Sequence, residues 1–174
     1  MSAVLDPGTV ARRWWHETFG RGDAGARTAR AQLRRCDTVL EVLMIESSHR
    51  LSQQLRRHGS HAAPGQIALM ALGLAHIRAP GTRPVARVFG EARRAQAPPR
   101  LSRRRFDRLV RAASHEALLA PLRAAMRMVP NEPISIEWLA RDLYHWSATV
   151  ARRWCYQYYD EPDRSAASIT EASE

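Results

Sequence analysis

The stretch Gly65-Gln-Ile-Ala-Leu-Met-Ala-Leu-Gly-Leu-Ala-His-Ile77 decides the fold of this chain, because it is strongly apolar. Its apolar residues do not alternate with polar ones, as those of a half-buried strand would. Ala, Leu and Met also favour helix over strand. We therefore predict a central helix that is buried on all sides, since a helix that is hydrophobic all round belongs in a core.

Outward from this helix, apolar residues recur at helical spacing in both directions, and strand-like alternation is missing. The sequence thus predicts an all-α fold, a two-part helical bundle of about eight helices, with a turn at Ala79-Pro80-Gly81. The seven helices besides the central one are predicted at residues 9–19, 26–44, 47–57, 85–94, 102–113, 114–128 and 135–159.

The stretch Ala97-Pro98-Pro99 is the best candidate for a domain boundary, since neither proline can continue a helix. We predict an N-terminal helical domain at 9–96 and a C-terminal helical bundle at 97–160. From Asp160 onward the chain holds five acids, one arginine and no apolar stripe. This composition predicts a disordered acidic tail at 161–174.

Composition argues against several classes of protein. Cys36 and Cys155 lie far apart and outside any C-x-x-C pair, so we expect no zinc site and two buried, reduced thiols. No stretch approaches the ~18 consecutive apolar residues of a membrane span, and the N-terminus lacks the pattern of a secretory signal. We therefore expect a soluble, cytoplasmic protein without a cofactor.

The charge of the chain points to a polyanionic partner. All 27 basic residues are arginine, and with 17 acids they give a formal net charge of +10. Residues 1–159 carry 26 arginines against 12 acids, an excess of 14 positive charges. Guanidinium groups suit phosphate oxygens, so nucleic acid is the first partner to consider. A GC-rich coding sequence explains arginine in place of lysine, but neither the net charge nor the clustering.

The arginines form two clusters, each on one side of a predicted helix. On a helical wheel, Leu109 and Val110 fall near Phe106, whereas the arginines of that helix fall on the opposite side. The arginines of the helix that contains Leu33 also gather on one side. An ordinary solvated face is the alternative, but few acids compensate these charges. The predicted nucleic-acid-binding residues are Arg27, Arg30, Arg34, Arg35, Arg103, Arg104, Arg108 and Arg111.

Catalysis has little support in the sequence. No Gly-rich phosphate loop, nucleophile elbow, H-x-x-x-H pair or carboxylate cluster for a divalent metal is present. We therefore predict that the chain is not an enzyme and holds no metal. Most aromatic residues recur at core spacing and are predicted to pack. Tyr158 and Tyr159, at the end of the last helix, are harder to place.

Two other interpretations of the arginine clusters stay open. One is a helical DNA-binding transcription regulator, although the helices at 103–113 and 114–128 leave almost no turn for a helix-turn-helix. Pro121 would also interrupt the recognition helix. The other is a protein-interaction module whose arginines meet acidic protein surfaces.

Several landmarks of the chain, in order over residues 11–159, resemble the CasB family, the small subunit of the type I-E CRISPR surveillance complex Cascade. Each landmark alone is weak, but their order and spacing together are specific. They are Trp14-Trp15, the run Arg27-Thr-Ala-Arg-Ala-Gln-Leu-Arg-Arg-Cys36, His49-Arg50-Leu51, Leu74-Ala75-His76, the run Leu101-Ser-Arg-Arg-Arg-Phe-Asp-Arg-Leu-Val-Arg111, the run Leu139-Ala-Arg-Asp-Leu-Tyr-His-Trp146 and the run Arg153-Trp-Cys-Tyr-Gln-Tyr-Tyr159.

The resemblance implies an all-helical, non-catalytic subunit that lies beside the guide RNA as two copies. Its basic surface would hold the target and non-target DNA strands and stabilise the R-loop in antiviral defence. The implied partners are the guide RNA, both DNA strands, other Cascade subunits and a second copy of the chain. Carried onto matching positions, the resemblance makes Arg34 and Arg35 the first candidates for strand contact. The next are Arg103, Arg104, Arg108 and Arg111, followed by Arg27 and Arg30. Arg105 falls nearer the flank of its helix.

Overall fold

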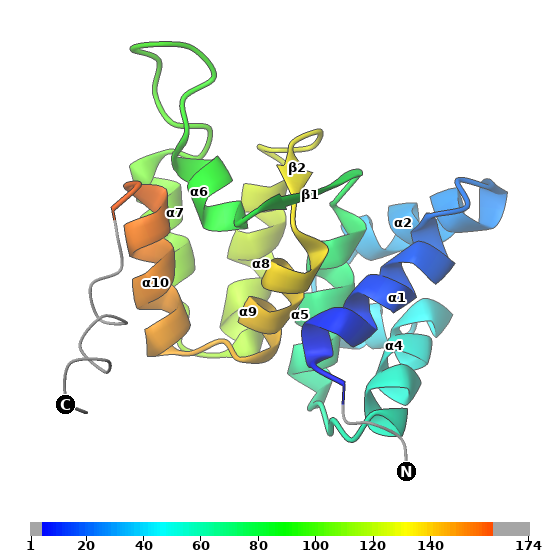
Figure 1. The fold of residues 1–174 in the computed structure, drawn as a ribbon. Helices are drawn as coiled ribbons and strands as arrows, with labels where there is room; N and C mark the ends of the chain where they lie inside the picture. Colours follow the sequence, from blue (N-terminus) through cyan, green and yellow to red (C-terminus); the bar gives the residue numbers. More distant parts are fainter. Residues whose placement is uncertain (1–4, 162–174) are drawn as a thin grey trace, which may run out of the picture.

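The central helix predicted from the sequence is present and buried. A computed structural model describes residues 5–161, and these residues fold around α5 (Pro64–Ala75), ten of whose twelve residues are buried (Figure 1). Pro64 stands in the first turn, where its missing N–H leaves no hydrogen bond unmade. The Gln66 side chain accepts a hydrogen bond of 2.7 Å from the Ala63 N–H and so caps the helix.

Within residues 5–161, four helices precede α5, although the sequence predicted only three. The helix predicted at 26–44 is interrupted, because the backbone of Cys36 is extended and the Thr38 side chain caps a new helix by accepting from the Glu41 N–H. The four helices are α1 (Pro7–Phe19), α2 (Ala24–Arg35), α3 (Val39–Leu43) and α4 (Glu46–Arg57).

Five more helices follow α5 within residues 5–161, the first of them before the predicted boundary at 97–99. The single helix predicted at 135–159 is in fact two, since His145 ends the first and the Ser147 hydroxyl caps the second at the Val150 N–H. Ser135 caps the first of them as predicted, by accepting from the Trp138 N–H. The five helices are α6 (Val85–Gly90), α7 (Arg103–Val110), α8 (His115–Met126), α9 (Ile136–Tyr144) and α10 (Ala148–Tyr158).

The expectation of a fold without strands is wrong. The segment predicted as a turn lies in β1 (Ala79–Arg83), which pairs in parallel with β2 (Pro133–Ile134) above α9 (Figure 1). The strands approach so closely that a Cβ on Gly81 would come within 2.7 Å of Pro133. Strands this short show no alternation of apolar and polar residues in the sequence. They form because backbone groups far apart along the chain pair with each other.

One hydrophobic core runs through both predicted parts. Its buried side chains extend along the chain from Val10 to Tyr158, and α1 packs against α9 from the other side of the predicted boundary at 97–99. The division into domains stays a prediction. Cys36 is buried as expected, whereas Cys155 is only half-buried, and both are free thiols.

Two further expectations concern the ends of the chain and membranes. The predicted disordered tail lies outside the described residues except for Glu161. Within residues 5–161, no helix is long and apolar enough to cross a membrane.

Candidate nucleic-acid interface

Helix α7 presents the arginine ridge that the sequence predicted. Phe106 and Leu109 are buried on one side, and the Phe106 ring stacks on Tyr158 with 4.0 Å between ring centroids. On the other side Arg103, Arg104, Arg108 and Arg111 are exposed and line one shallow concavity together with a single acid, Asp107. The helical wheel is thus confirmed, because the spacing of residues within one helix fixes which of them share a face.

Arg105 lies on the flank of α7 that faces α8. Its side chain is exposed, and its guanidinium lies 3.3 Å from the Met128 sulfur, just past the end of α8. The guanidinium of Arg93 lies 3.4 Å from the carbonyl oxygen of the same methionine. Arg105 therefore belongs to the same cationic surface as the α7 ridge and extends it toward the end of α8.

A second cationic cleft forms where α2 ends. Arg34 and Arg35 line it together with Arg127, which follows α8 directly. Arg34 is half-buried, and this desolvation lowers the pKa of its guanidinium. The neighbouring charges of Arg78 and Arg127 lower the pKa of Arg34 further, so these cations destabilise one another until an anion joins them.

Arg78 and Arg127 join this cationic region although no pattern in the sequence singled them out. Arg78 follows the central helix and Arg127 follows α8, so neither belongs to a cluster along the sequence. Arg123 brings α8 to this cleft, because its guanidinium donates to the carbonyl oxygens of Arg35 and Cys36 at 3.3 and 3.2 Å and pairs with Asp37. No signal in the sequence could have found this contact between segments nearly ninety residues apart.

The structure corrects the expected position of Arg30. Instead of lying on an exposed ridge, its guanidinium donates to the carbonyl oxygens of Ala75 and Ile77 at the end of α5. It also lies over the Phe19 ring, 4.7 Å from the centroid. Burial lowers the pKa of Arg30, as do its neighbours Arg78 and Arg34. A cation at a helix C-terminus stabilises the fold, so Arg30 acts as a cap.

Arg27 remains exposed, but it too has a local partner. Its guanidinium donates to the carbonyl oxygen of Gly22 at 2.7 Å and closes the turn before α2. Gly22 needs its positive φ of 65° to make that turn. Of the first predicted cluster, only Arg34 and Arg35 therefore point into a shared cationic cleft.

Most acids of the described chain are committed to other arginines. The arginines that form ion pairs within residues 5–161 are Arg12, Arg50, Arg83, Arg87, Arg100, Arg123, Arg141 and Arg153. In the same range, no ion pair neutralises the exposed arginines of α7, the cleft lined by Arg34, Arg35 and Arg127, or the neighbouring Arg78. This combined set, with Arg105, is called the arginine surface below.

The aromatic residues mostly pack, as predicted. The indole N–H groups of Trp14, Trp15 and Trp146 donate to backbone carbonyl oxygens, and all three side chains are buried. Tyr158, which was hard to place, is also buried and donates its hydroxyl to the Leu101 carbonyl oxygen at 2.7 Å. Tyr159 is exposed beneath Arg103.

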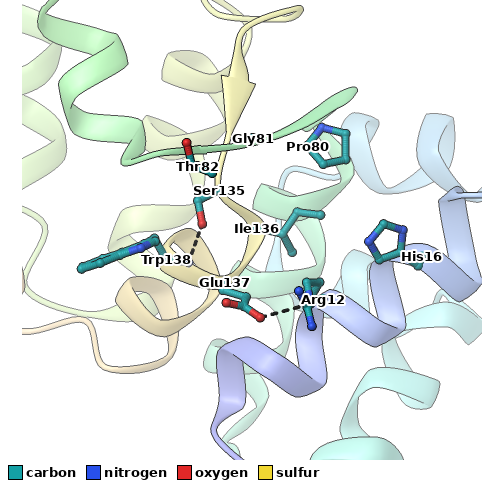
Figure 2. Close-up of a pocket in the computed structure, with 9 residues that line it drawn as sticks. All are labelled: Arg12, His16, Pro80, Gly81, Thr82, Ser135, Ile136, Glu137 and Trp138. Carbon is teal, nitrogen blue, oxygen red and sulfur yellow. Dashed lines mark hydrogen bonds and ion pairs between the residues drawn. The ribbon is translucent and has the colours of Figure 1, made fainter.

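A different cavity, of about 420 Å³, opens between α1, β1 and the start of α9 (Figure 2). Its arginine, Arg12, pairs with Glu137 at 3.1 Å, and His16 and Pro80 line the side opposite the exposed Trp138. Because this single cation is neutralised, the cavity lacks the excess charge that a phosphate requires. The arginine surface is therefore the better candidate interface.

The described residues offer no metal site, since no three His, Cys, Asp or Glu side chains gather within residues 5–161.

The expectation of almost no turn between α7 and α8 is wrong, because residues 111–114 separate them. Even so, the first turn of α8 carries the acid Glu116, and the helix buries Leu118 and Leu122. An acid in the leading turn opposes entry into a DNA groove, which argues against a helix-turn-helix reader.

The fold and this surface define a class: a small, mostly helical protein with a cationic face that no ion pair among residues 5–161 neutralises. The comparison with protein families then gives the particular assignment. Residues 29–159 match the CRISPR-associated protein Cse2 family, and the chain belongs to that family. The resemblance to the CasB family, another name for Cse2, is thereby confirmed. No curated protein matches the chain.

Among solved structures, the chain is similar to a chain in the crystal structure of E. coli Cascade bound to a PAM-containing double-stranded DNA target. The TM-score is 0.62 at 20% sequence identity, over 89% of this chain and 95% of that chain. At this identity the likeness shows a shared fold.

Proposed function

We propose that this chain is the non-catalytic small subunit of a type I-E Cascade complex, where its arginine surface contacts nucleic-acid backbones and stabilises the R-loop. The proposed partners are the target and non-target DNA strands, the guide RNA, other Cascade subunits and a second copy of the chain. Membership of the Cse2 family and the fold shared with a chain of E. coli Cascade support this assignment.

The observation that carries the proposal is the joining of two separate arginine clusters by the end of α8. Arg34 and Arg35 share a cleft with Arg127, and the next residue, Met128, lies against Arg105 at the start of the α7 ridge. The charges thus follow an extended path rather than a single point. A strand backbone needs such a path, because its phosphates are spaced along its length.

Weak contacts of this kind suffice for the proposed role. Forming an R-loop exchanges one duplex for another of similar stability, so modest contacts to the two separated DNA strands shift the balance. Contacts to phosphates do not depend on base sequence, and each releases counterions. Binding should therefore be indifferent to sequence and steeply weakened by salt. A transcription regulator would instead discriminate between DNA sequences.

Fluorescence anisotropy of the purified chain with unrelated DNA strands tests the proposal. We expect the double substitution Arg34→Ala and Arg35→Ala to weaken binding to all sequences alike and to reduce the salt slope by about 1.5, since each arginine that binds a phosphate contributes about 0.7–0.9. The matched control is Arg56→Ala with Arg57→Ala, since this exposed pair removes the same charge and also ends a helix. Equal weakening by both pairs, or strong preference for one sequence, would contradict the proposal.

A further inference from the structure

A small apolar groove lies beside the arginine surface, between α7 and α8. Its volume is about 200 Å³, and its floor consists of side chains from α8. Arg108 lines both this groove and the concavity on the α7 ridge, whereas Asp107 lines only the latter. The residues that line the groove are Arg105, Arg108, Ala120, Pro121, Ala124 and Ala125.

The floor of the groove exposes apolar surface between two cations. Ala120 and Ala124 are exposed and Pro121 is half-buried, so their methyl groups and ring meet solvent. Pro121 lies inside α8 and has no N–H, so it offers no hydrogen-bond donor to a ligand. Arg105 and Arg108 are exposed at the rim, and no acid lines the groove.

The apolar floor and the two arginines at the rim together indicate which class of ligand fits the groove. A bare anion would need the two arginines but not the apolar floor, and an apolar group would need the floor but not the arginines. A nucleotide has both an apolar base face and a phosphate. The groove is smaller than the pockets of about 300–1,000 Å³ that enclose drug-sized ligands, so it suits one ring system and not a longer chain.

We propose that this groove holds one unpaired nucleobase of a single strand whose phosphates lie on the arginine surface. The base lies with its face on Ala120, Pro121 and Ala124, and the guanidinium plane of Arg105 or Arg108 stacks on it. A base that is paired in a duplex cannot reach the groove, so the site favours single strands. This inference rests on the proposed function, because the phosphate contacts bring the base to the groove.

The test fills the groove without changing the charge. Ala124→Leu adds a side chain over the floor, and leucine is a good helix former at this exposed position. Ala117→Leu is the matched control, because Ala117 is exposed on the same helix but does not line the groove. The full chain is titrated with single-stranded oligothymidylate and with an abasic strand of equal length, which has the same phosphates but no bases.

For the unaltered chain we expect oligothymidylate to bind about fivefold more tightly than the abasic strand, the low end of the contribution of one stacked base. Ala124→Leu should lower oligothymidylate affinity to the abasic level and leave abasic binding unchanged, whereas Ala117→Leu should change neither. Equal binding of the two strands by the unaltered chain would overturn the base site and leave the proposed function standing. Failure of both strands to bind at low salt would overturn both proposals.

Discussion

Replacing Arg78 and Arg127 together by alanine should weaken DNA binding to an extent that depends on salt. Both side chains are exposed, and both add positive charge beside Arg34 at the end of α2. If each contacts one phosphate of a single strand, the pair contributes about 1.4 to the slope of log affinity against log salt. The ratio of wild-type to variant affinity should then fall about sevenfold between about 50 and 200 mM salt.

Anisotropy titrations with one single-stranded DNA at several salt concentrations provide the slopes. We expect the fold to be unaffected, because neither arginine takes part in an ion pair or side-chain hydrogen bond recorded among residues 5–161, and their removal relieves repulsion. Circular dichroism checks this. Two parallel salt plots, with affinity lowered equally at every concentration, would refute the reasoning, because removing an arginine that binds a phosphate must change the slope. The variant with Arg56 and Arg57 replaced serves again as the charge-matched control.

Two further predictions concern stability. Asp142 is 3% exposed and accepts a hydrogen bond of 2.6 Å from Trp154 while pairing with Arg153, so Asp142→Ala should cost about 3–5 kcal/mol of unfolding free energy in urea. A cost below about 1 kcal/mol would show that this buried pair is unimportant. Burial lowers the pKa of His76 to about 4, with the charges of Arg34 and Arg127 adding to the effect. Because the unfolded chain then binds more protons between that value and about 6.5, stability should fall by about 2 kcal/mol as pH drops from about 7 to about 5. His76→Gln should remove that part of the pH dependence, and an unchanged pH profile would contradict the assignment.

Local patterns in the sequence were enough to predict individual helices and their faces. The apolar stretch from Gly65 to Ile77 predicted the buried α5, and the spacing of Phe106 and Leu109 predicted the exposed ridge of α7. Both predictions succeed because helix periodicity is a property of neighbouring residues. The helix breaks at 36–38 and 145–147 were missed, since apolar spacing continues through them while Thr38 and Ser147 cap new helices.

The sequence by itself therefore determined that the chain is mostly helical, strongly cationic and similar to the CasB family. Tertiary structure alone decided which arginines belong to one surface. Packing turned Arg30 inward onto the last carbonyl groups of α5 and brought Arg127 beside Arg34 and Arg35. It also paired β1 with β2 across more than fifty residues. Such contacts depend on where whole helices pack, because no local spacing encodes the distance between residues that are far apart along the chain.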